Sequence, residues 1–133
     1  LADRVSRIRA HASATPESLK ADRDAFDVVA FNLMLAVQIC ADIASHIIAD
    51  EGWSSAKNLG EAFTRLEEHG LLTRQLADAM RRAVGLRNVV AHGYAGVDTA
   101  AVHAAATSGV SDLKAFAQAI GAWASARSGQ SEV

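Results

Sequence analysis

The stretch that decides the fold runs from residue 22 to residue 50 and reads DRDAFDVVAFNLMLAVQICADIASHIIAD. Its apolar side chains recur every three or four positions, which is the spacing of one buried helix face. The residues on that face are Phe26, Val29, Ala30, Leu33, Val37, Ala41, Ala44 and Ile48. We therefore expect one long helix from about Asp22 to Asp50, which Glu51-Gly52 ends.

The sequence on both sides of this helix keeps the helical spacing. Val5 and Ile8 predict a short first helix, and Thr15-Pro16 supplies a capping residue followed by a first-turn proline. Three further helical regions are expected, at residues 54–68, 73–92 and 97–126, the last weakened at Ser108-Gly109. No strand-type alternation is present. The pattern predicts an all-α, up-and-down bundle of about five helices.

Length and composition agree with one helical domain. The chain has 133 residues, enough for a single core, and its low aromatic content of 5% suits helices packed through aliphatic side chains. We assign residues 1–127 to the domain and residues 128–133 to a disordered tail. The apolar stretch at 31–41 is broken by Asn32 and Gln38 and is short for a bilayer, and no signal peptide is seen. A soluble cytoplasmic protein is expected.

The charge and the single cysteine exclude several function classes. The net charge of -2 gives no overall field for gathering nucleic acid, so an RNA-handling site would have to be local. Cys40, the one cysteine, leaves no intrachain disulfide and no cysteine-based zinc site. It lies within an apolar run, which indicates a small core residue.

The chemistry-bearing segment is RNVVAHGY at residues 87–94. On a helix, Asn88 and His92 share one face because they are four apart, and Arg87 and Tyr94, two turns apart, share an adjoining stripe. Gly85 and Gly93 bracket the set and leave backbone that another molecule can approach closely. Residues 72–94 hold four arginines, at 74, 81, 82 and 87, against the single acid Asp78, a local charge of +3.

This set of side chains suits a phosphodiester. Arginine offers a planar fork to phosphate oxygens and can stabilise charge that grows in the transition state. Histidine can take a proton from a ribose 2′-OH or return one to the leaving oxygen, and asparagine can orient either group. No metal or cofactor is required. By spacing alone, however, an arginine and a histidine five positions apart are common on helices, where most are surface residues or satisfied core histidines.

Three blocks of the sequence resemble one family in the same order. GLRNVVAHGY at 85–94 is similar to the R-N-x-x-x-H-x-Y signature of the HepT-like toxins of the HEPN superfamily. QICADIASHII at 38–48 resembles that family's second-helix segment, and EAF at 61–63 with GLL at 70–72 resembles the next helix and turn. The resemblance covers roughly residues 3 to 126, and its departures, such as Gly93 and an alanine-rich last helix, are mild.

The resemblance implies a homodimer in which two copies of the motif meet across a two-fold axis. It implies a metal-independent endoribonuclease that cleaves RNA as the toxin of a toxin–antitoxin pair, with Arg87, Asn88 and His92 as catalytic residues. Its partner would be a nucleotidyltransferase (MNT-type) antitoxin that can transfer AMP to Tyr94. It also implies a supporting role for Asp42, close enough to orient Arg87 or His92.

Other readings of the same residues stay open. Asp42, His46 and Asp50 form one helical stripe, which would be either a metal site or, more commonly, a polar face. His11, His69 and His103 are expected to be exposed. Trp53 would stack on a base or plug a corner between helices. For the whole chain, the alternatives to an RNA-cleaving toxin are a non-catalytic module that docks a nucleotidyltransferase or nucleotide, and a purely structural bundle.

Overall fold

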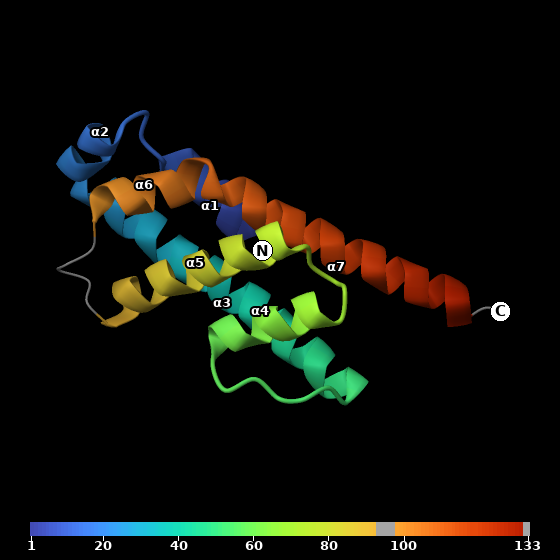
Figure 1. The fold of residues 1–133 in the computed structure, drawn as a ribbon. Helices are drawn as coiled ribbons and strands as arrows, with labels where there is room; N and C mark the ends of the chain where they lie inside the picture. Colours follow the sequence, from blue (N-terminus) through green and yellow to red (C-terminus); the bar gives the residue numbers. More distant parts are fainter. Residues whose placement is uncertain (93–97, 132–133) are drawn as a thin grey trace.

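The computed structural model describes residues 1–92 and 98–131, and within these ranges the regular structure is helical, without strands. The all-α prediction is therefore confirmed. Seven helices occur in the described ranges: α1 (Ala2–His11), α2 (Pro16–Ala21), α3 (Arg23–Glu51), α4 (Leu59–Glu68), α5 (Arg74–His92), α6 (Thr99–Thr107) and α7 (Gly109–Ser131) (Figure 1). The number exceeds the expected five or so because the chain breaks at Asp22 and again at Ser108.

The helix ends follow the capping residues read from the sequence. Thr15 forms a capping box at the start of α2, with its Oγ1 accepting from the Ser18 amide at 3.1 Å. Oγ1 of Thr73 accepts from the amide of Leu76 at 3.2 Å and caps α5. Gly52 adopts the left-handed conformation (φ 71°) that ends α3, a conformation that strains other residues.

Two boundaries differ from the expected ones. The helix expected from residue 54 begins only at Leu59, because Asn58 caps it by accepting a hydrogen bond of 2.9 Å from the Glu61 amide. At the other end of the chain, α7 continues to Ser131, past residue 126, where the last helix was expected to end. The weakness expected at Ser108-Gly109 is a complete break between α6 and α7.

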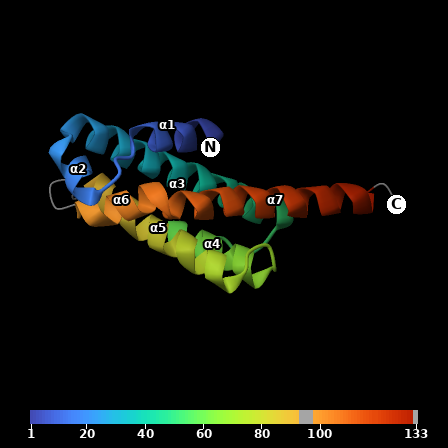
Figure 2. The same ribbon diagram turned by 90° about the horizontal axis from the view of Figure 1, so that it is seen from above.

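The core is built around α3, which packs against each of the other six helices in the described ranges. Figures 1 and 2 show α3 running through the middle of the bundle, with α7 reaching beyond it toward the C-terminus. Phe63 of α4 and Phe116 of α7 are fully buried and meet edge to face, with centroids 5.6 Å apart. Such aromatic pairs add about 0.5–1.5 kcal/mol to the free energy gained by burial.

By length and composition, α3 passes as a membrane-spanning helix, which differs from the expectation drawn from residues 31–41 alone. Half of the 18-residue apolar segment of α3 that could cross a membrane is buried inside the protein. The reason is that its apolar residues face six neighbouring helices, so its hydrophobicity serves the core of this fold.

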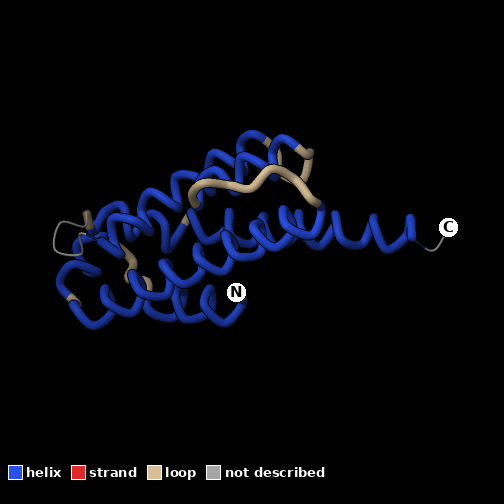
Figure 3. The backbone as a smooth tube through the Cα atoms, turned by 90° about the horizontal axis from the view of Figure 1, so that it is seen from below, coloured by secondary structure: helices blue, strands red, loops and turns tan. Residues whose placement is uncertain are grey.

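The surroundings of Trp53 and of three histidines were also expected from the sequence. Trp53 lies in the loop between α3 and α4, which is drawn in tan in Figure 3. Its ring stacks on the ring of His69, which follows α4, with the two centroids 3.7 Å apart, so Trp53 fills a corner between helices. His11 and His69 are exposed, as expected. The prediction for His103 was wrong: it is half-buried, and its Nε2 donates to the Ser13 carbonyl at 2.7 Å because α6 packs on the segment between α1 and α2.

Candidate active site

The motif lies on the last two turns of α5. The inner face of this helix buries Ala77, Met80, Val84 and Val90, and that register turns Asn88 and His92 to the exposed side. Arg87 lies at the edge between the two faces and is half-buried. His92 is the last residue of α5. Tyr94 falls outside the described residues, so its expected alignment with Arg87 has no structural counterpart here.

The guanidinium of Arg87 is held by two neutral oxygens. Its Nη1 donates to Oδ1 of Asn88 at 3.1 Å, and its Nη2 donates to Oε1 of Gln38 on α3 at 2.9 Å. Its Nε is buried and has no hydrogen-bond partner. The hydrogen bonds of Nη1 and Nη2 therefore fix the plane of the Arg87 guanidinium. Asn88 and His92 are exposed on the same helix.

Asp42 enters this arrangement through Gln38. Nε2 of Gln38 donates to Oδ1 of Asp42 at 2.9 Å, and among the described residues no carboxylate lies within 4.0 Å of the Arg87 nitrogens. Asp42 is therefore connected to Arg87 through the side chain of Gln38. Gln38 was not singled out as a site residue, although its spacing of four from Asp42 places both on one face of α3.

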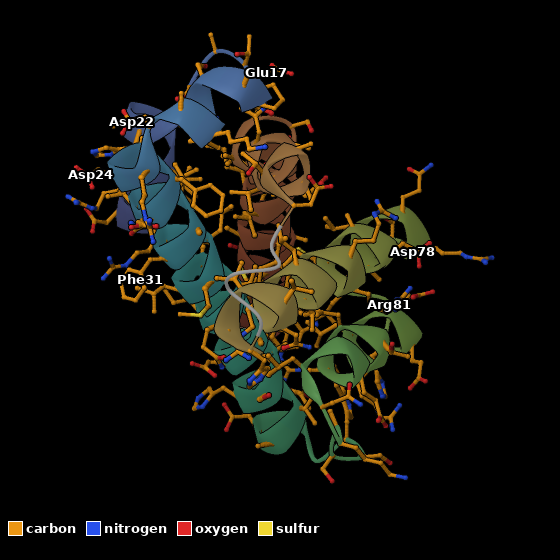
Figure 4. The ribbon with its side chains drawn as sticks, turned by 90° about the vertical axis from the view of Figure 1, so that its left-hand side faces the viewer. Glu17, Asp22, Asp24, Phe31, Asp78 and Arg81 are labelled. Atoms are coloured by element: carbon orange, nitrogen blue, oxygen red, sulfur yellow. The ribbon has the colours of Figure 1, made fainter. Side chains whose placement is uncertain are left out.

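The local positive charge is smaller than the sequence count implies. Arg81 of α5 forms ion pairs with Asp78 of its own helix and, at 3.1 Å, with Glu67 of α4, and it also donates to Oγ1 of Thr64. Figure 4 shows Arg81 between α4 and α5. The hydrogen bond from Arg81 lowers the pKa of the Asp78 carboxyl. Arg81 thus joins two helices, and Arg87 is the motif's cation.

A groove of about 570 Å³ opens beside Arg87, between α3, α5, α6 and α7. Its wall is mainly aliphatic, with Arg82, Arg87 and Asp112 among the charged residues that line it. Arg87 therefore lines this apolar groove and also donates a hydrogen bond to the exposed Asn88.

The stripe of Asp42, His46 and Asp50 on α3 is a polar face of the helix. His46 lies 3.2 Å from Asp50, and both side chains are largely exposed. Within residues 1–92 and 98–131, no three histidine, cysteine or acidic side chains are grouped so that they could hold a metal ion. Asp42 of the same stripe instead bonds to Gln38.

Comparison with models of protein families gives a match over most of the chain. A family model described as "Ribonuclease HepT-like" matches residues 1–120, which include α3 and α5. The chain belongs to the HepT-like family. The match contains His92 and the hydrogen-bonded group of Gln38, Asp42, Arg87 and Asn88.

Individual HepT-like relatives are moderately similar. The mRNA nuclease HepT of Shewanella oneidensis is 35% identical over 68 residues, which cover 51% of this chain and 51% of that protein. The alignment thus spans about half the length of the curated relative. Two solved structures are similar over 90% of each chain with a TM-score of 0.84: a toxin–antitoxin with AMP-PNP (27% identity), and a tri-AMPylated Shewanella oneidensis HEPN toxin in complex with MNT antitoxin (28% identity).

Proposed function

We propose that this chain is a metal-independent endoribonuclease, the toxin of a toxin–antitoxin pair, and that it works in the cytoplasm as a homodimer. Membership of the HepT-like family and the resemblance to an mRNA nuclease support the class of reaction. The observation that carries the proposal is the fixed Arg87 guanidinium, held by Asn88 and Gln38 on the surface that exposes Asn88 and His92.

These side chains suit cleavage of RNA by its own 2′-OH. The 2′-oxygen forms a bond to phosphorus while the bond from phosphorus to the 5′-oxygen breaks. A histidine base takes the proton of the 2′-OH, and an acid gives a proton to the leaving 5′-oxygen. Arg87 stabilises the negative charge on the phosphoryl oxygens, for which a preoriented guanidinium is well suited. His92 is the proton-transfer group, and Asn88 orients Arg87 and the substrate.

One chain supplies one His92, whereas this reaction needs both a base and an acid. A second copy facing the first would supply the other histidine and a second arginine. The surface agrees with such a pairing: Phe31 on α3 is 53% exposed and Val89, within the motif, is 45% exposed. Figure 4 shows Phe31 on the outer side of α3. Contact between copies would remove this apolar area from water.

The partner that we propose is a nucleotidyltransferase antitoxin of the MNT type. The support is that similar solved chains are toxins in complex with an antitoxin, one of them tri-AMPylated. Transfer of AMP to Tyr94 would place a bulky anion two residues from His92 and would compete with RNA for Arg87. This arrangement gives the antitoxin a covalent means of silencing the toxin.

The decisive experiment compares cleavage of an in vitro transcribed mRNA, in EDTA, by the wild type and by His92→Ala and Arg87→Ala. Each substitution is expected to lower the rate about 100-fold or more, in line with the loss of a proton-transfer group or a charge-stabilising donor. The matched control is His46→Ala, an exposed histidine on α3 that pairs with Asp50. Full activity of His92→Ala would contradict the mechanism.

The antitoxin part is tested separately by intact mass after incubation with the antitoxin and ATP. The wild type is expected to gain one or more AMP units, and Tyr94→Phe is expected to lose that gain. An antitoxin complex with an unmodified Tyr94 would indicate steric inhibition. A complex that forms while the free dimer cleaves no RNA, tRNA included, would instead indicate a non-catalytic docking module.

A further inference from the structure

Gln38 lies where the central helix meets the motif. It is half-buried on α3, and its amide oxygen is 2.9 Å from Nη2 of Arg87 while its amide nitrogen is 2.9 Å from Oδ1 of Asp42. Its side chain therefore connects the cation of α5 to a carboxylate on its own helix. The role of this residue is inferred from these contacts and rests on the proposed function.

The chemistry of the two neighbours fixes the orientation of the amide. An arginine side chain only donates hydrogen bonds, and an ionised carboxylate only accepts them. An amide satisfies both because its oxygen can face Arg87 while its nitrogen faces Asp42. The flipped amide would place two donors together on one side and two acceptors together on the other. Asp42 thus locks the Gln38 oxygen toward Arg87.

A neutral partner also preserves the charge of Arg87. A carboxylate in direct contact with a guanidinium forms a strong bidentate pair and competes with a phosphate for the same nitrogens. Both hydrogen-bonded partners of Arg87, Gln38 and Asn88, are uncharged amides. The guanidinium is therefore held in place and keeps its positive charge available for a substrate.

We propose that Gln38 is a positioning residue that orients the Arg87 guanidinium toward the RNA phosphate without neutralising it, and that Asp42 acts by fixing the Gln38 amide. Gln38 itself does not touch the reacting atoms. Its side chain determines where the charge of Arg87 lies when phosphate arrives, and misplacement of a catalytic group by about 1 Å can cost about 100-fold in rate.

Two substitutions at this position separate orientation from charge. Gln38→Leu removes both hydrogen bonds and leaves the charge of Arg87, so kcat is expected to fall about tenfold while KM stays within about twofold. Gln38→Glu keeps an acceptor for Arg87 but neutralises it, so KM is expected to rise about tenfold. The affinity for a non-cleavable 2′-deoxy oligonucleotide is then measured at a series of salt concentrations. Only Gln38→Glu should make the affinity less dependent on salt, by the amount expected for the loss of about one phosphate contact.

Asp42 gives the third comparison. Asp42→Asn keeps an oxygen that can accept from Gln38, so its loss of kcat should be clearly smaller than that of Gln38→Leu. Asp42→Leu, which removes that acceptor, should approach the Gln38→Leu value. Gln118→Leu, a matched exposed glutamine on α7, is the control and should behave as the wild type. Equal losses in Asp42→Asn and Gln38→Leu would overturn the role given to Asp42.

A readout without activity completes the test. NMR of ¹⁵N-labelled arginine should show slow rotation of the Arg87 guanidinium in the wild type and fast rotation in Gln38→Leu. If the wild type neither binds nor cleaves RNA, the proposed function fails, and this measurement still decides whether Gln38 holds Arg87. Unchanged rotation in Gln38→Leu, or unchanged kcat and KM in an active protein, would overturn the proposal.

Discussion

Nη2 of Arg87 on α5 donates a hydrogen bond of 2.9 Å to Oε1 of Gln38 on α3, across 49 positions of the sequence. The bond links the motif to the helix around which the bundle packs. Rigid helices on both sides limit how far the guanidinium can move, which the charge-stabilising role proposed for Arg87 would require.

Arg87→Lys is expected to lower RNA cleavage about 100-fold while the protein stays folded. An ammonium keeps the charge but lacks the planar fork, so it cannot hold Gln38 and Asn88 and also present two nitrogens to a phosphate. Single-turnover rates on an mRNA measure the effect. Arg74→Lys, at the exposed first residue of the same helix, is the matched control. Equal rates for wild type and Arg87→Lys would show that charge alone suffices.

Gly85→Ala is expected to stabilise the fold and weaken the function. Gly85 is exposed in the middle of α5, and a Cβ there would meet no atom within 4 Å, so the helix should gain about 0.5–1 kcal/mol. Nothing inside the described chain requires glycine at this point, which favours close approach by another molecule. Urea denaturation and cleavage assays should therefore move in opposite directions. A variant that is more stable and fully active would remove this reading of Gly85.

Val89→Asp and Phe31→Asp are each expected to convert a dimer into monomers and to lower cleavage. A charge at an exposed apolar position leaves the single chain intact but resists burial between two copies. Sedimentation at a series of concentrations measures the association. Ala122→Asp, on the exposed surface of α7, serves as the control and should leave the dimer intact. Dimers that survive both substitutions would place the interface elsewhere.

Cys40 is expected to make stability fall at alkaline pH. Burial raises the pKa of its thiol from 9.0 to about 12, so between these values the unfolded chain loses a proton that the folded chain keeps. Unfolding is therefore favoured as pH rises, by up to about 1.4 kcal/mol per pH unit, and the effect is absent below pH 9. Urea denaturation of wild type and Cys40→Ala at pH 8 and pH 10 tests this. The stability difference between them should narrow at pH 10, and an equal difference at both pH values would refute the assignment.

Much of the geometry of the candidate site could be predicted because it is local. Arg87, Asn88 and His92 lie on one helix, and helical periodicity alone separates the exposed Asn88 and His92 from the buried Val90. The role of Arg81 could not be predicted in this way. Its partner Glu67 lies on α4, and only the packing of α4 against α5 brings the two charges to 3.1 Å.

The sequence by itself determined the helical class, the long central helix and the caps at Thr15 and Thr73, because each depends on residues within one or two turns. It also determined the motif, which family resemblance then placed among ribonucleases. The tertiary structure decided that Gln38 contacts Arg87 and that Asp42 contacts Gln38 and not Arg87 directly. The physical reason is that a side chain's partner on another helix depends on how two helices pack, and periodicity along either helix does not fix that packing.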